Sequence, residues 1–213
     1  MIKNIIKLGS ANLVSQVLPF VITPIVTRIY SPDSFGSFSI FISIVALISV
    51  IASARYELAI VICAKDQLKD LMVVILALSS ALSFLLFLIL VLIFNVYPEL
   101  YRSSPELIFS PFAIFISCLS VSLTYYLTRY GSFGSLGKGA ILRAVVFCSL
   151  QLTLFIFFAQ SLSLVLSWVV SSATMMIYLL IKAFPYLKND FSGSLRVTRV
   201  LSNSVTYYRN RCS

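Results

Sequence analysis

The chain has 213 residues, of which 60% are hydrophobic and only 11% are charged, and its mean hydropathy is +1.02. Soluble domains contain about 45–50% apolar and about 25% charged residues, so this composition excludes an ordinary soluble protein. Histidine is absent, which removes the commonest general base and metal ligand. The four cysteines are scattered and form no CxxC pair. We therefore expect no enzyme activity, no metal site and no cofactor.

The net charge of +9 comes from Lys and Arg residues that lie between apolar runs. A nucleic-acid-binding protein usually gathers its basic residues in one patch or stripe. The scattered positions of the basic residues in this chain therefore argue against a nucleic-acid partner.

Long apolar runs separated by short polar breaks predict an all-α, polytopic membrane protein. The runs 71–94 and 107–128 contain no charged residue, and about 20 helical residues cross a bilayer core. The stretch 140–183 is too long for one span, and a polar break at Ala159–Ser161 divides it into a helical hairpin. The sequence thus predicts a bundle over residues 1–185 and a basic polar tail over 186–213. The predicted spans are 8–26, 35–54, 71–94, 107–128, 140–159 and 162–182.

The basic residues also predict the orientation of these six spans. Lys and Arg are enriched in cytoplasmic loops near span ends. If the N-terminus lies in the cytoplasm, 14 basic residues fall on the inner side, and only Arg28 and Arg102 fall on the outer side. Both ends of the chain are therefore expected in the cytoplasm.

The first predicted span carries polar residues on one helical face. Separations of 4, 7 and 4 residues keep them close together, and Pro19 and Pro24 should bend the helix between them. Two interpretations remain open, because this face can form hydrogen bonds to other helices or line a cavity. The polar set comprises Asn12, Gln16, Thr23 and Thr27.

Five charged residues lie close to the predicted spans. Arg28, Arg129 and Arg143 lie near span ends, where a long side chain can reach the headgroups or turn into the bundle. Arg55 and Glu57 differ, because the apolar stretch 58–64 follows them. The second helix is therefore expected to continue to about residue 64 and to place an ion pair inside the bundle.

Three sequence motifs carry a family resemblance. Residues 24–36 read PIVTRIYSPDSFG, residues 55–60 read RYELAI, and residues 125–133 read YYLTRYGSF, followed by Leu142-Arg143. Together they resemble the N-terminal half of the bacterial polysaccharide-export flippases, which are the Wzx-type O-antigen and capsule transporters. These belong to the multidrug/oligosaccharidyl-lipid/polysaccharide exporter superfamily. The resemblance covers about residues 5 to 185.

The resemblance implies a transporter that flips undecaprenyl-diphosphate-linked oligosaccharide across the bacterial inner membrane. Such transporters have two six-helix lobes that face each other across a central cavity, where basic residues meet the diphosphate and acidic sugars. Arginine suits this task because its guanidinium offers a bidentate donor fork to phosphate. By this analogy the candidate substrate-binding residues are Arg28, Arg55, Glu57, Arg129 and Arg143, together with the polar face of Asn12 and Gln16.

The chain departs from the family pattern in having only six predicted spans. Residues 191–213 do not resemble the family, so we expect a truncated first half that needs a separate second half or self-association. Besides a purely structural or interaction membrane protein, two alternatives remain open. One is another polytopic protein of envelope-glycan synthesis, such as a polymerase or an acyltransferase. The other is a fragment related to multidrug antiporters, although Glu57 is the one acidic residue expected at membrane depth.

Overall fold

The computed structural model describes residues 2–53, 55–63, 67–99, 105–157 and 160–191. Of the predicted tail 186–213, residues 186–191 continue helix α8, and the rest lies outside the described residues. The secondary structure of the described part is helical, and six of the helices are long and apolar enough to cross a membrane. This confirms the predicted all-α bundle with about six spans. The helices are α1 (Ile2–Ile29), α2 (Pro32–Ser53), α3 (Tyr56–Ile62), α4 (Leu68–Val96), α6 (Ser110–Arg129, after the 3-10 helix η2, Pro105–Phe109), α7 (Phe133–Leu154) and α8 (Gln160–Phe191).

The helical hairpin predicted in the last apolar stretch is present as α7 and α8, but α7 begins at Phe133 rather than near residue 140. Glycine is more typical of turns than of helix interiors, yet residues 133–139 are helical. At Gly139 the absence of a side chain permits α7 and α8 to approach closely, as small residues do between membrane helices. A Cβ atom at Gly139 would lie only 3.3 Å from the Leu179 side chain and 3.4 Å from Tyr178, both on α8.

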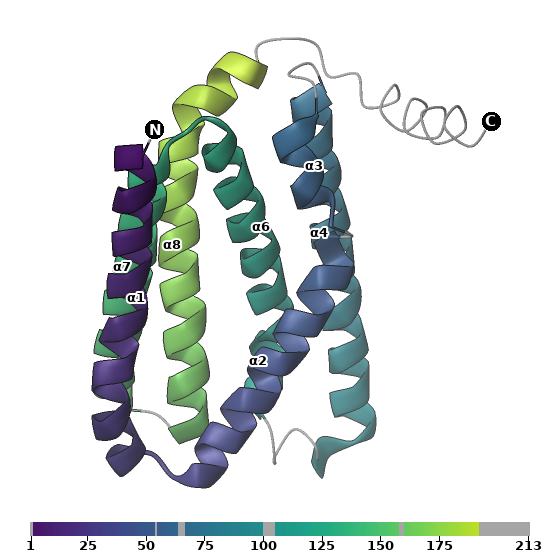
Figure 1. Cartoon of the computed structure of the whole chain (residues 1–213). Helices are drawn as coiled ribbons and strands as arrows, with labels where there is room; N and C mark the ends of the chain where they lie inside the picture. The colour runs from purple at the N-terminus through teal and green to yellow at the C-terminus, as the bar shows by residue number, and fades with distance from the viewer. Residues whose placement is uncertain (1, 54, 64–66, 100–104, 158–159, 192–213) are drawn as a thin grey trace, which may run out of the picture.

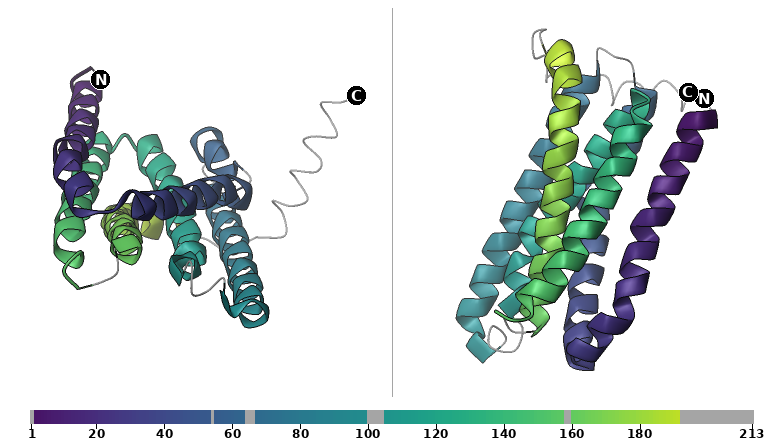
Figure 2. Two further views of the ribbon diagram at one scale, coloured as in Figure 1. Left: turned by 90° about the horizontal axis from the view of Figure 1, so that it is seen from below. Right: turned by 90° about the vertical axis from the view of Figure 1, so that its left-hand side faces the viewer.

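The helices are arranged so that α1 forms one edge of the bundle. It packs on α7, α7 packs on α8, and α8 packs on α6, which also contacts α2, α3 and α4 (Figures 1 and 2). Helices α1 and α2 meet at a short turn around Tyr30 and diverge from there, because α2 crosses the bundle diagonally. The two helices are therefore far apart at the end that carries the N-terminus.

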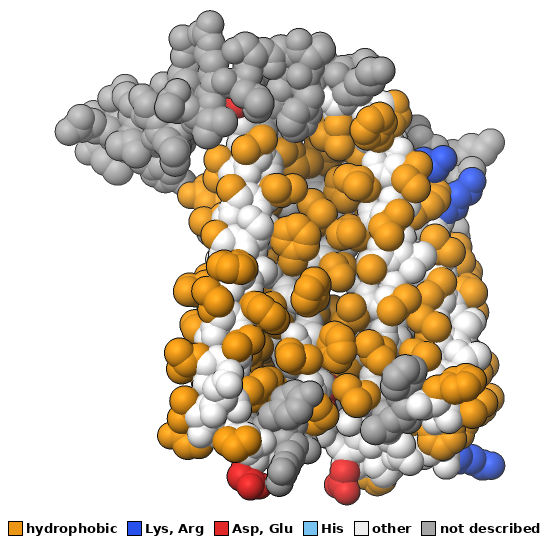
Figure 3. Space-filling view, turned by 180° about the vertical axis from the view of Figure 1, so that it is seen from behind, with side chains coloured by type: hydrophobic (Ala, Val, Ile, Leu, Met, Phe, Trp, Pro, Cys, Tyr) orange, Lys and Arg blue, Asp and Glu red, His pale blue; other side chains and the backbone are white. Residues whose placement is uncertain are grey.

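The buried core runs along α6 and α8. Its middle part joins Phe41 of α2, Ile114 and Cys118 of α6 and Val165 of α8. A second part surrounds Tyr126 between α3, α4, α6 and α8. The outer surface is also apolar: on the face shown in Figure 3, hydrophobic side chains form a broad band, and the charged side chains lie toward its two ends. An apolar band of this kind suits a protein surrounded by hydrocarbon rather than water.

The second span is broken at Arg55, which contradicts the expected continuous helix to residue 64. Helix α2 ends at Ser53, and α3 begins at Tyr56. Arg55 between them has φ 59° and ψ 16°, in the left-handed region. Only glycine adopts this conformation without a steric penalty. The break separates the expected ion pair: Arg55 is exposed, Glu57 is buried, and no ion pair joins them in the described part of the chain.

The left-handed conformation makes Arg55→Gly a stabilising change. Glycine removes the clash of Cβ with the carbonyl, which costs about 1–2 kcal/mol, while its greater freedom in the unfolded state offsets part of this gain. We expect a net gain of about 0.5–1 kcal/mol in the free energy of unfolding, measured by detergent titration in micelles. Arg55→Ala is the matched control because it removes the side chain but keeps Cβ. A gain from alanine as large as the gain from glycine would exclude backbone strain as the cause.

Candidate functional site

A cavity of about 400 Å³ lies between α1, α2, α7 and α8, on the side where α1 and α2 diverge. This volume falls in the range of small-molecule pockets, about 300–1,000 Å³. Its walls are mostly apolar, and Arg143 supplies the positive charge. Among the described residues that line it, none is acidic. The lining residues are Ser15, Pro19, Phe38, Ile42, Ala140, Arg143, Ala144, Phe147, Trp168 and Met175.

Arg143 lies at the middle of a membrane span and not at its end, contrary to the sequence-based placement. It follows the first residue of α7 by ten positions and precedes the last by eleven. At 1.5 Å per residue, it is about 15 Å from either end of the helix, which is too far for simple snorkelling. A charge at this depth costs about 2.5–3.5 kcal/mol on insertion scales and usually marks a functional site. In the described structure, Arg143 has no hydrogen-bond or ion-pair partner.

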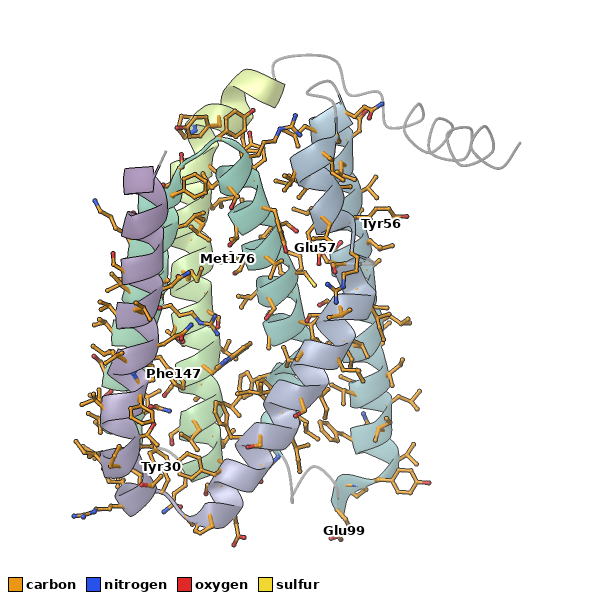
Figure 4. All side chains as sticks on the ribbon, in the orientation of Figure 1. Tyr30, Tyr56, Glu57, Glu99, Phe147 and Met176 are labelled. Carbon is orange, nitrogen blue, oxygen red and sulfur yellow. The ribbon has the colours of Figure 1, made fainter. Side chains whose placement is uncertain are left out.

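Aromatic rings form the other walls of the cavity. The guanidinium carbon of Arg143 lies 5.5 Å from the ring centroid of Trp168, within the range of a cation–π contact. Phe38 of α2 and Phe147 of α7 stack with 6.5 Å between their ring centroids. Figure 4 shows Phe147 in the lower half of the bundle, above Tyr30 at the lower end. The cavity thus offers one cation within an aromatic enclosure near the middle of the membrane.

Helix α1 borders the cavity with its polar face. Pro19 has no N–H, so the carbonyl of Ser15 loses its helical donor, while the Ser15 hydroxyl donates to the carbonyl of Asn12. Asn12 and Gln16 lie within about 60° of Pro19 around the helix axis, and both are exposed. Hydrocarbon would leave their amides unsatisfied. The polar face of α1 therefore borders the cavity, although Asn12 and Gln16 are not among its lining residues.

The other basic candidates lie away from this cavity. Arg28 is exposed in the last turn of α1, where its charge complements the helix dipole. Arg129, at the end of α6, donates to the carbonyl of Ile60 at 2.6 Å and to the sulfur of Cys63 at 3.3 Å. A cation at these positions satisfies carbonyls at the C-terminal end of α3. Arg129 therefore holds α3 against α6, which is a structural task.

Glu57 is buried, with 7% of its surface exposed, and its Oε2 atom has no hydrogen-bond partner in the described structure. It lies on α3, which packs against α6 and α4. Figure 4 shows it across the bundle from Phe147. Glu57 is therefore not part of the Arg143 cavity. Of the seven sequence-based candidates, the structure places Arg143 in the cavity and Asn12 and Gln16 at its border.

A hydrogen-bonded clamp, formed by Tyr30, Gln151, Gln160 and Ser163 with the turn at Ser31–Ser34, lies at the end of the bundle where α1 and α2 meet, and Figure 4 shows Tyr30 there, below Phe147. The Tyr30 hydroxyl donates to the carbonyl of Gln151 at 2.6 Å and accepts from the Ser163 hydroxyl at 3.0 Å. Burial raises the pKa of Tyr30, and the Ser163 hydrogen bond partly opposes this effect, so the phenol remains a donor at neutral pH. The Gln160 side chain accepts from the backbone N–H of Ser31 and from the Ser34 hydroxyl. The clamp explains three residues of the TRIYSPDSFG motif.

The sequence interpretation overlooked Trp168 and the aromatic walls. One signal was available: Trp168 is the only tryptophan, and it lies inside an apolar run rather than at a membrane interface, where tryptophan is enriched. Gln151 was also overlooked, although an amide within a span usually needs a partner, and Gln160 was interpreted only as part of the polar break between the last two spans.

Comparison with known proteins identifies the family. A family model described as "Polysaccharide biosynthesis protein" matches residues 1–211. The chain belongs to the polysaccharide biosynthesis protein family. The match extends past residue 191, so the expectation that residues 191–213 lie outside the family is wrong. No curated protein and no solved structure matches this chain. The polysaccharide biosynthesis assignment, together with the six apolar helices, describes a multi-pass membrane protein of polysaccharide synthesis.

Proposed function

We propose that this chain forms one lobe of a transporter that flips undecaprenyl-diphosphate-linked oligosaccharide across the bacterial inner membrane. The observation that carries the proposal is the Arg143 charge, which lies in a cavity about 15 Å from either end of α7. A cation at this depth is costly unless a partner compensates it. A diphosphate carried into the bilayer by its lipid would be that partner.

The lining of the cavity favours transport over catalysis. Arg143 is the ionisable side chain among the described lining residues. General acid–base catalysis needs a group that can exchange a proton near neutral pH, and arginine remains protonated. Binding and release of an anion need only a stable positive charge. A polymerase or an acyltransferase is therefore a poorer fit to this cavity than a flippase.

The same lining argues against a multidrug antiporter with a cationic substrate. Arg143 would repel a cation, and the aromatic rings around it already hold one positive charge. The polar face of α1 borders the cavity, and α1 and α2 diverge beside it (Figure 1). We propose that a second six-helix lobe, either a separate half-transporter or another copy of this chain, packs against this side of the cavity in the active transporter, since alternating access needs two halves around a central site.

The proposal is tested by ligand binding to the chain in phosphatidylcholine vesicles, which contain no other protein. Trp168 fluorescence then reports on the cavity directly, because the chain has no other tryptophan. We expect a saturable change with farnesyl diphosphate and none with farnesol, which lacks the phosphates. A response to the lipophilic cation tetraphenylphosphonium without a response to farnesyl diphosphate would instead support a cation antiporter.

Transport itself is tested in a bacterial strain that lacks its O-antigen flippase. We expect surface polysaccharide to return when the chain is produced together with a second lobe. Restoration by a variant carrying Arg143→Ala would contradict the assigned role of the cavity.

A further inference from the structure

Trp168 holds the Arg143 side chain in an unusual way for a charge inside a membrane. The guanidinium carbon lies over the indole ring at 5.5 Å from its centroid. The ring is itself fixed, because Phe41 is fully buried and packs edge-to-face against it, with 6.1 Å between centroids and an angle of 83°. Two successive contacts therefore determine where the Arg143 charge lies.

An aromatic partner has a different consequence from a carboxylate partner. A carboxylate would occupy the N–H donors of the guanidinium and neutralise its charge. The face of an indole ring attracts the cation through its quadrupole and accepts no conventional hydrogen bond in the plane of the guanidinium. The five N–H donors of Arg143 lie in that plane and remain available to a ligand.

We propose that Trp168 is the positioning residue of the cavity: it holds Arg143 as a cation that is not neutralised, and so makes the cavity selective for a diphosphate ester attached to an apolar chain. This inference rests on the proposed function, because it requires an anion to bind Arg143. Beyond the proposed function, it names Trp168 as the residue that fixes the direction of the Arg143 N–H donors. It also explains why the cavity accepts anions: the Arg143 charge is not neutralised. The stacked rings of Phe38 and Phe147 supply the apolar surface beside the charge.

Three substitutions at Trp168 separate positioning from simple packing. Farnesyl diphosphate binding to the chain in phosphatidylcholine nanodiscs is measured by isothermal titration calorimetry. Trp168→Leu fills space but removes the ring quadrupole, and we expect the dissociation constant to rise about 2- to 30-fold, as expected for the loss of a cation–π contact. Trp168→Phe keeps an aromatic face and should recover most of the lost affinity. Trp168→Glu supplies an ion-pair partner for Arg143 and should abolish binding.

Wild-type fluorescence provides a readout that does not depend on the folding of any variant. Farnesyl diphosphate should change Trp168 emission with the same dissociation constant that calorimetry gives, since the ligand alters the charge over the ring. Equal affinity in wild-type, Trp168→Leu and Trp168→Glu chains would overturn the positioning role, while loss of binding in Arg143→Ala would still support the proposed function. Absence of binding to the wild-type chain would overturn both.

Discussion

Replacing Arg143 by alanine is expected to lower the affinity of the chain for farnesyl diphosphate by about 10- to 100-fold. Hydrogen bonds to a charged partner contribute about 1.5–3 kcal/mol, and tenfold in affinity corresponds to about 1.4 kcal/mol. Arg143→Lys should have an intermediate affinity, because lysine keeps the charge and loses the planar donor fork. The measurement is calorimetric titration in phosphatidylcholine nanodiscs.

Stability provides the second half of this prediction. Arg143 has no ion-pair partner in the described structure and lies in the middle of α7, so its removal relieves the cost of a charge at membrane depth. The alanine variant should therefore unfold no more easily than the wild-type chain in a detergent titration, although it binds the ligand far less tightly. A purely structural arginine would show the opposite pattern.

Arg28→Ala is the matched control, since Arg28 is an exposed arginine at the end of α1 and outside the cavity. Its affinity for farnesyl diphosphate should equal that of the wild-type chain. Unchanged binding in Arg143→Ala, or an equal loss in Arg28→Ala, would show that the cavity does not recognise the anion through Arg143.

The number and approximate positions of the spans could be predicted because a run of about 20 apolar residues has few alternatives to a membrane helix. The depth of Arg143 in the membrane could not be predicted from the sequence. It depends on where α7 begins, and a glycine-rich segment is more typical of a turn than of the start of a membrane helix. Gly139 instead lies in the helix against α8, where an added Cβ atom would come within 3.3 Å of the Leu179 side chain and 3.4 Å of the Tyr178 ring. That contact is tertiary and leaves no mark in the local pattern.

The sequence predicts one site for the five charged candidates, and the structure separates them for a related reason. Motif residues were assumed to share one site, but adjacency along the chain does not fix the direction of a side chain. A left-handed residue at Arg55 turns it away from Glu57, and sequence rules assign such a conformation to glycine first. Arg129 donates a hydrogen bond to the carbonyl of Ile60, which lies 69 residues earlier in the chain. The orientation with both ends in the cytoplasm remains a prediction.

Tyr30→Phe is expected to destabilise the chain by about 1–3 kcal/mol, the usual cost of leaving a buried hydrogen-bonding group without its partner. The change removes the hydroxyl that bonds Gln151 and Ser163 but keeps the ring that packs edge-to-face on Phe35 and Phe155. The loss is measured as the free energy of unfolding in a detergent titration.

The matched control is Tyr56→Phe, which makes the same chemical change at an exposed tyrosine of α3. It should leave the free energy of unfolding within about 0.5 kcal/mol of the wild-type value. Equal losses at the two positions would show that the clamp does not stabilise the fold through these hydrogen bonds.

The clamp also fixes the end at which α1 and α2 meet, next to the cavity between them. Helix α1 packs chiefly on α7, and the clamp joins its end to the last turn of α7 and the first turn of α8. Because α1 and α2 diverge from this fixed end, weakening it should increase hydrogen exchange at residues 26–35 while the middle of α6 stays protected. An increase of equal size in α6 would indicate general unfolding rather than release of this one end.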